Sequence, residues 1–267
     1  MNAALLLLAD SRLPAGGHGH SGGAEEAVRI GAIHDLAGLA AFLRGRLATA
    51  GLVTAALAAA ACELGAAHLS ASPPPPADGP PAEVPARANG VLPAPTPAPA
   101  NGSSPPPETS RSAWVRLDAE ADARISSPAQ REASRTQGRL LLRTSRRIWP
   151  SPVLDALAGA VPQGAHHPLA LGAVAAVAGC SPAEAALAAA YTSVTGPATA
   201  AVRLLGLDPV AVHRLLAELA PALERVAATV PTGGSDGSWE SLPAHAAPAL
   251  DLLAEQHIRA DLRLFVS

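Results

Sequence analysis

The chain has 267 residues, of which 49% are hydrophobic, 2% aromatic and 15% charged. This length allows one large or two small domains whose core needs no disulfide or metal. All 19 basic residues in the combined lysine and arginine count are arginine. A Walker A phosphate loop, a protein kinase and Schiff-base chemistry are therefore excluded, because each requires a lysine. The net charge of −3 gives no general attraction to nucleic acid or to anionic membranes.

The cysteines and the N-terminus point to the cytoplasm. Cys62 and Cys180 stand apart in alanine-rich stretches and form no CxxC motif, which favours buried thiols in a reducing compartment. The apolar run Leu5–Leu8 follows no cationic region and ends at Asp10, so we predict no export signal. The longest uncharged apolar stretch, 47–62, is shorter than a membrane span of roughly 18 residues. We predict a cytoplasmic protein that makes no membrane contact.

The predicted elements are all helices, because β-branched and aromatic residues are scarce and no segment alternates cleanly. Helix starts are marked by Ser127-Pro128-Ala129-Gln130, Ser181-Pro182-Ala183-Glu184 and Asp208-Pro209, which place a capping side chain before a proline. From the N-terminus onward, we predict helices over 22–31, 35–49, 51–69, 117–125, 128–147, 152–161, 167–178, 182–205, 209–229 and 243–262. The fold class is therefore all-α, a single bundle of roughly ten helices.

A proline-rich segment interrupts this pattern. Between Pro73 and Pro107 lie 14 of the 27 prolines, with almost no large apolar residue among them. Such a segment cannot form a core, and neither flanking part looks self-sufficient. We predict one all-α domain over 1–267, interrupted by a disordered insert at 71–112, and we expect fast amide exchange over 73–107.

The glycine loop, residues 13–23, leads into the predicted helix that begins near Ala24. A glycine-rich turn before a helix N-terminus resembles an anion site. No strand precedes the loop and no lysine can complete a phosphate loop. Two interpretations stay open: the glycines permit positive φ and close packing, or the loop contacts a partner.

No residues indicate a catalytic or metal site. His18 and His20 are two apart and His166 and His167 are adjacent, so neither pair places two ligands on one helical face. There is no H-E-x-x-H motif and no G-x-S-x-G nucleophile elbow. We assign no catalytic residue, no metal ligand and no cofactor. The remaining alternative is an enzyme that acts on a small molecule, which would be detected as turnover without partners.

An arginine stripe runs along the predicted helix at 128–147. Its members are spaced four residues apart: Arg131, Arg135, Arg139, Arg143 and Arg147. Such a stripe is a solvated helix face, a surface for an acidic protein or a phosphate-binding surface. The competing function is therefore an all-α nucleic-acid-binding regulator, although stacking aromatic residues are missing.

The tail, residues 259–267, ends the chain on an apolar patch that contains Phe265. Free tails seldom end in apolar residues. The tail therefore either docks on its own domain or binds a partner.

Four segments together resemble the UreF family of urease accessory proteins and keep the family's order. They are LPAGGHGHSGGAE at 13–25, REASRTQGRLL at 131–141, GPATAAVRL at 196–204 and RLFVS at 263–267. In the family, the loop usually has aromatic residues where this chain has His18 and His20. The proline-rich insert of this chain is longer than we expect in that family.

The resemblance implies an all-α accessory protein, not an enzyme. Such a protein dimerises, binds the UreD (UreH) accessory protein, and forms a scaffold for the GTPase UreG and for apo-urease during nickel insertion. It implies that the tail takes part in the UreD contact, and that Arg263 helps to order the surface facing the GTPase. We expect partner binding to order the tail, with the glycine loop packed near it.

The residues predicted to contact partners lie in the loop, the stripe, the segment after Gly196 and the tail. They are Pro14, Gly16, Gly17, His20, Ser21, Glu25, Arg135, Arg139, Arg203, Arg263, Leu264 and Phe265.

Overall fold

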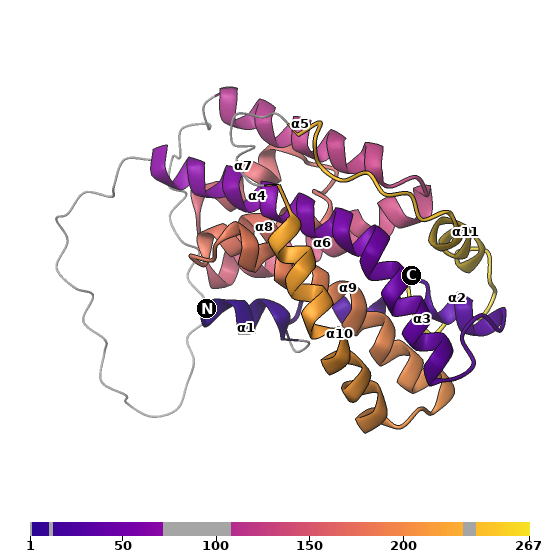
Figure 1. The fold of residues 1–267 in the computed structure, drawn as a ribbon. Helices are drawn as coiled ribbons and strands as arrows, with labels where there is room; N and C mark the ends of the chain where they lie inside the picture. Colours follow the sequence, from indigo (N-terminus) through magenta and orange to yellow (C-terminus); the bar gives the residue numbers. More distant parts are fainter. Residues whose placement is uncertain (1, 11–12, 72–107, 232–238) are drawn as a thin grey trace, which may run out of the picture.

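The computed structural model describes residues 2–10, 13–71, 108–231 and 239–267, and these form helices connected by loops (Figure 1). The α-helices are α1 (Ala4–Ala9), α2 (Ala24–Arg29), α3 (Leu36–Arg46), α4 (Leu52–Ala71), α5 (Glu108–Arg124), α6 (Pro128–Ile148), α7 (Pro152–Ala160), α8 (His167–Val177), α9 (Pro182–Leu205), α10 (Pro209–Thr229) and α11 (Pro248–His257). A 3₁₀ turn occupies Gly17–Gly19, and a π-helical segment, Leu47–Gly51, joins α3 to α4. The described part contains no strand, so the all-α prediction is confirmed.

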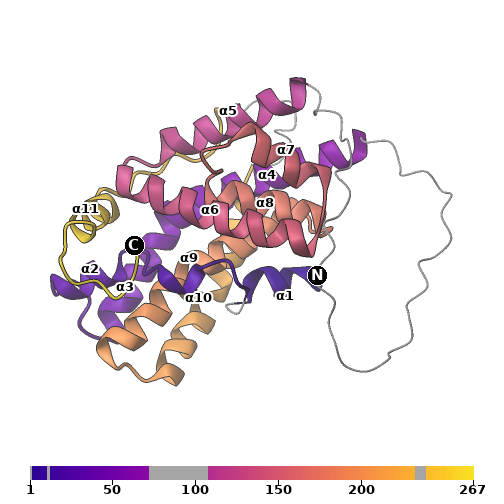
Figure 2. The same ribbon diagram turned by 180° about the vertical axis from the view of Figure 1, so that it is seen from behind.

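The centre of the molecule is the contact of α8 with α4, which α6 and α9 extend on either side (Figures 1 and 2). Gly172 of α8 packs directly on the backbone of α4, because a Cβ placed there would lie 2.1 Å from the Ala58 carbonyl oxygen and 2.7 Å from the Ala61 Cβ. Gly65 of α4 meets Ala176 of α8 in the same way, at 2.9 Å. Alanine and glycine thus build this core by letting helix backbones approach each other.

The helix that runs through α3, the π-helical segment and α4 is continuous over Leu36–Ala71. By length and composition alone it is the one helix in the described residues that could cross a membrane. Within the protein, 67% of its apolar window is buried against other helices. The stretch 47–62 was expected to be too short for a membrane span, whereas the continuous helix is long enough. Its burial is typical of the core helix of a globular protein.

One helix was not predicted, two helices differ from their predicted bounds, and the helices predicted at 35–49 and 51–69 are joined into one. The described part adds α1, which was not predicted and is fastened by a hydrogen bond from the Asn2 amide to Glu184 Oε1 (2.8 Å). Helix α5 begins at Glu108 instead of 117, because buried Trp114 lies one turn before buried Leu117 and continues the same face. Helix α11 covers only part of the predicted 243–262.

The predicted insert at 71–112 is too long at both ends. Ala71 is the last residue of α4, and residues 108–112 are the start of α5. The remaining part, 72–107, lies outside the described residues. Both flanking helices contribute to one continuous apolar core, in which Leu64 of α4 and Trp114 of α5 are buried.

Candidate functional site at the glycine loop and the tail

The glycine loop bends where its sequence is rich in glycine. Gly16, Gly22 and Gly23 have φ values of 77°, 59° and 90°. This left-handed region favours glycine, so the prediction of positive φ is confirmed at these three positions. At Gly22 a Cβ would also lie 3.0 Å from Pro197 Cγ, so the loop packs closely on α9.

The tail lies along the glycine loop, and the C-terminus ends beside α2 and α3 (Figures 1 and 2). The Val266 amide donates to the Gly19 carbonyl oxygen at 2.6 Å, and the Ser21 amide donates to the Ser267 carbonyl oxygen at 2.5 Å. His20 Nδ1 lies 2.6 Å from Ser267 Oγ. The glycine loop and the tail therefore form one hydrogen-bonded unit.

Glu25, in the first turn of α2, holds the tail backbone with its carboxylate. Its Oε1 accepts from the Leu264 amide at 2.7 Å, and its Oε2 accepts from the Phe265 amide at 3.0 Å. His257, buried at the end of α11, places Nε2 3.3 Å from the Phe265 carbonyl oxygen and 3.8 Å from Glu25 Oε2. Hydrogen bonds to a charged acceptor are stronger than those to a neutral one, so Glu25 is the main polar anchor of the tail.

The tail buries one side chain and exposes those on either side of it. Phe265 is 6% exposed, and the Arg203 guanidinium carbon stands 5.4 Å from the centre of its ring. Leu264 and Val266 are 77% and 63% exposed. One buried aromatic residue thus anchors a segment that presents apolar side chains outward.

The tail is docked on the glycine loop in the structure of the chain without a partner. We expected partner binding to order it, but in the single chain it already lies on the loop. Glu25 supplies two acceptors and Phe265 a buried ring, and both belong to this chain. Of the two alternatives for the tail, docking on its own chain is the one observed. The expectation that the glycine loop packs beside it is confirmed.

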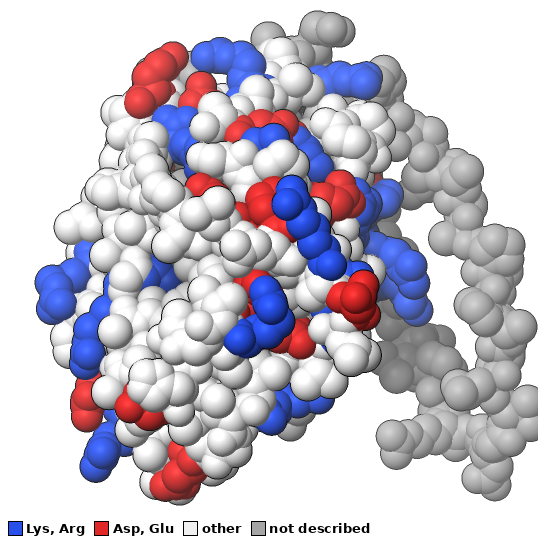
Figure 3. Space-filling model, turned by 90° about the vertical axis from the view of Figure 1, so that its right-hand side faces the viewer, with Lys and Arg blue, Asp and Glu red and all other residues white. Residues whose placement is uncertain are grey.

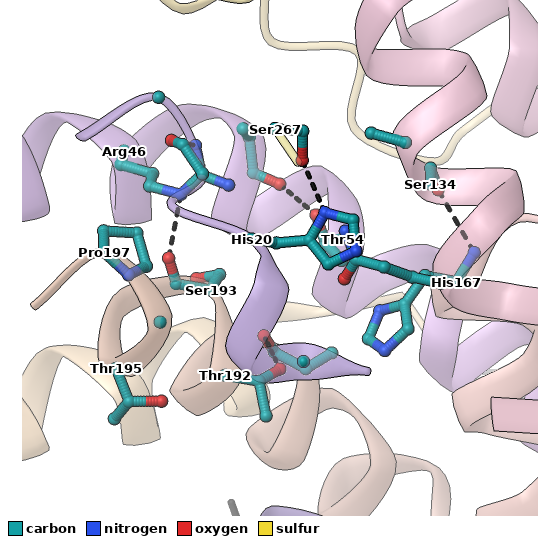
Figure 4. Close-up of a pocket in the computed structure, with 18 of the residues that line it drawn as sticks. His20, Arg46, Thr54, Ser134, His167, Thr192, Ser193, Thr195, Pro197 and Ser267 are labelled. Atoms are coloured by element: carbon teal, nitrogen blue, oxygen red, sulfur yellow. Dashed lines mark hydrogen bonds between the residues drawn. The ribbon is translucent and has the colours of Figure 1, made fainter. Parts of the chain in front are cut away.

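A cavity of about 680 Å³ opens beside the loop, lined by α4, α6, α8 and α9, by Arg46 at the end of α3, and by parts of α10 and α11 (Figure 4). His20, His167 and Arg46 line it. Burial lowers the pKa of His20, and burial together with the nearby His20 lowers the pKa of His167 to about 4. Both imidazoles are therefore neutral at pH 7. His20 and His167 are 147 residues apart in the sequence and were not expected to meet, whereas the fold places both on this cavity.

Arg135 lies elsewhere and is buried. Its guanidinium pairs with Asp118 Oδ2 at 2.9 Å and with Asp122 Oδ2 at 2.7 Å, and it donates to the Gly164 carbonyl oxygen at 2.7 Å. It joins α5, α6 and the loop before α8, so it is not available at the surface. The prediction that Arg135 contacts a partner is corrected accordingly, because its own acidic partners lie within the chain.

The same two aspartates and His166 form the one group of possible metal ligands in the part of the chain that the structure describes. Their ligand atoms lie within 4.8 Å of one another, and His166 Nε2 is 2.9 Å from Asp122 Oδ1. The guanidinium of Arg135 already supplies positive charge to both carboxylates. We therefore explain this group as a buried ion-pair network joining α5 to α6.

The arginine stripe does not form a continuous basic surface. Arg131 donates to the Ile125 carbonyl oxygen at 2.6 Å, and Arg139 pairs with Glu132 Oε1 at 2.9 Å. Arg146 of the same helix pairs with Asp155 at 2.5 Å. Figure 3 shows basic and acidic side chains interspersed on the face it draws. The alternation of charges gives no support to the nucleic-acid alternative.

The remaining predicted residues fall into two groups. Ser21 is buried beside the tail, whereas Pro14, Gly17 and Arg263 are exposed. The Pro14 carbonyl oxygen accepts from Thr144 Oγ1 at 2.9 Å, which ties the start of the loop to α6. Arg139, also exposed, stands on that helix.

Sequence reasoning missed three residues at the site: His257, Ser267 and Arg46. Nothing in their local sequence marks them, because their partners are 8 to 247 residues away along the chain. Ser267 falls within the resemblance segment, but only the fold shows that its hydroxyl meets His20.

Comparison with known proteins gives the family. The family model of UreF matches residues 33–220. The urease accessory protein UreF of Mycolicibacterium vanbaalenii is 41% identical over 99% of this chain and 98% of its own length. That of Mycobacterium sp. strain JLS is 40% identical over 98% and 97%, and that of Mycobacterium tuberculosis H37Rv is 36% identical over 99% and 98%. The chain therefore belongs to the UreF family of urease accessory proteins.

Proposed function

We propose that this chain is a non-catalytic scaffold for maturation of the urease nickel centre in the cytoplasm. It binds a UreD/UreH-type accessory protein, and the complex engages a UreG-type GTPase and apo-urease. Two copies of the chain form a homodimer within that complex. Nickel is the cargo of the assembly, and we assign no nickel ligand on this chain.

The observation that carries the proposal is the docked tail. Phe265 and Glu25 fix its backbone, while Leu262, Leu264 and Val266 point into solvent. Leu262 is the most exposed of these, at 91%. A monomeric soluble protein gains nothing from a row of exposed apolar side chains on a rigid segment, but a protein partner can bury them. The exposed Arg263 stands in the same row and offers a charged contact at its centre.

The test is co-elution of the full chain with the host's UreD-type protein and UreG-type GTPase on a sizing column, with guanine nucleotide and nickel present. We expect one joint peak. Removal of residues 263–267 should abolish the peak while circular dichroism shows the helical core intact. Separate peaks with all wild-type proteins folded would contradict the scaffold proposal.

A finer variant separates the outer face of the tail from its anchor. The double substitution Leu264→Ser and Val266→Ser changes only exposed side chains, so the loop and tail should stay docked. We expect binding of the UreD-type protein to weaken by about tenfold or more, because each lost apolar contact at an interface centre costs about 1 kcal/mol. Val210→Ser on α10, where the side chain is 75% exposed, is the matched control and should bind normally. Equal binding by all three proteins would remove the tail from the interface.

A further inference from the structure

Arg46, the last residue of α3, carries a charge on the wall of the cavity without an acidic partner. Its Nε donates to the Ser193 carbonyl oxygen at 2.8 Å, and its Nη1 donates to the Gly22 carbonyl oxygen at 2.8 Å (Figure 4). Asp251 lines the same cavity, but no carboxylate of the described residues lies close enough to Arg46 to form an ion pair or to shift its pKa. Within the described ranges, both hydrogen bonds of Arg46 go to backbone carbonyl groups.

Other arginines withdrawn from solvent in this chain are neutralised by carboxylates. Arg124, whose side chain is 7% exposed, pairs with Glu120, and Arg135, at 11%, pairs with two aspartates. Burial lowers the pKa of Arg46 to about 10, so the guanidinium is still a cation at neutral pH. A cation removed from water and held only by carbonyl groups leaves positive potential in the adjoining cavity.

The guanidinium keeps hydrogen-bonding capacity for a ligand. Its five N–H groups are arranged as a planar fork, and the described protein atoms accept from two of them. The guanidinium packs closely on Gly22, because a Cβ at that position would lie 3.1 Å from Nη2 and 3.2 Å from Cζ. Arg46 lines the cavity, and its remaining N–H groups have no acceptor among the described protein atoms.

We propose that the cavity at Arg46 is a binding site for a small oxyanion. A planar or tetrahedral oxyanion presents two oxygens at the spacing of the guanidinium fork, which supplies both charge and geometry. The neutral imidazoles of His20 and His167 line other parts of the cavity and can each donate one hydrogen bond to a ligand or to its hydration water. This site is separate from the outer face of the tail and does not depend on the proposed scaffold function.

The test uses the full chain without partners and three probes: bicarbonate, inorganic phosphate and sulfate, each titrated at constant ionic strength with chloride. We expect one probe to raise Tm saturably, by about 5 °C at about one hundred times its Kd, because a ligand of the folded state stabilises it. Bicarbonate as the best probe indicates a planar anion, and phosphate or sulfate a tetrahedral one. No saturable shift with any of the three would overturn the proposal.

Substitutions then locate the site. Arg46→Gln removes the charge and should abolish the shift, whereas Arg46→Lys keeps the charge without the fork and should weaken binding by about tenfold or more. Arg44→Gln is the matched control, since Arg44 is exposed in the last turn of the same helix and does not line the cavity, and it should bind like wild type. If Arg46→Gln does not fold, the test is an NMR titration of the wild-type chain with the same probe, followed at the ¹⁵Nε signal of Arg46. The chemical shift of that signal should change with the Kd found from Tm, and an unchanged signal would contradict the site.

Discussion

The contact between α4 and α8 and the contact between the glycine loop and the tail are held together in opposite ways. In the first, glycine and alanine remove side-chain volume until backbones touch, as at Gly172 and Ala58. In the second, a few hydrogen bonds fasten a short extended segment, and Glu25 provides two of them. The molecule is therefore rigid where the residues in contact are small and apolar. It can open locally where a carboxylate carries the contact.

The largest expected effect comes from adding a single methyl group at the contact between α4 and α8. Gly172→Ala places a Cβ 2.1 Å from the Ala58 carbonyl oxygen, so α4 and α8 must separate. We expect the free energy of unfolding to fall by about 3 kcal/mol or more, measured by urea denaturation. The matched control is Gly159→Ala in α7, where a Cβ meets nothing within 4 Å. It should be neutral or stabilise by roughly 0.5–1 kcal/mol. Equal effects at the two glycines would contradict the close-packing explanation.

A smaller effect is expected from a substitution that breaks the contact between the glycine loop and the tail and leaves the contact between α4 and α8 intact. Glu25→Ala removes the acceptor of the Leu264 and Phe265 amides, so the tail should open locally at a cost of about 2 kcal/mol. Hydrogen exchange should then become fast at 264–266 and stay slow in α4 and α8. Glu224→Ala, on the exposed side of α10, is the control and should change neither region. Loss of protection throughout the core would show that the two contacts are not separable.

The smallest expected effect concerns pH. The pKa of His167 is about 4 in the folded chain, lowered by burial, against about 6.5 when the chain is unfolded. The unfolded chain therefore binds more protons as pH falls below about 6.5, and folding loses stability down to about pH 4. We expect His167 to account for roughly 1–2 kcal/mol of this loss, because its side chain is only partly buried by surface area. His167→Gln should flatten the curve of unfolding free energy against pH, whereas His34→Gln, at an exposed position, should leave it unchanged. Parallel curves for all three proteins would exclude His167 as a contributor.

Local chemistry in the sequence determined where α6, α9 and α10 begin. Ser127, Ser181 and Asp208 each accept a hydrogen bond from an amide in the first turn of the helix that follows, as their spacing predicts. The glycine loop was also legible, because positive φ has a direct residue preference. The first half of α5 was not, since its polar sequence becomes a helix only through the buried face that continues at Trp114.

Tertiary structure alone decided what the charged residues do. Arg135 and Arg139 occupy equivalent positions in the stripe, yet one is buried against Asp118 and Asp122 and the other is exposed. Glu25 was selected through a family resemblance, but its role as the anchor of the tail depends on amides about 240 residues away. Caps, turns and helical faces are set by neighbours a few residues apart, so the sequence shows them directly. Ion pairs and tail docking depend on which distant segments meet, and only the fold determines that.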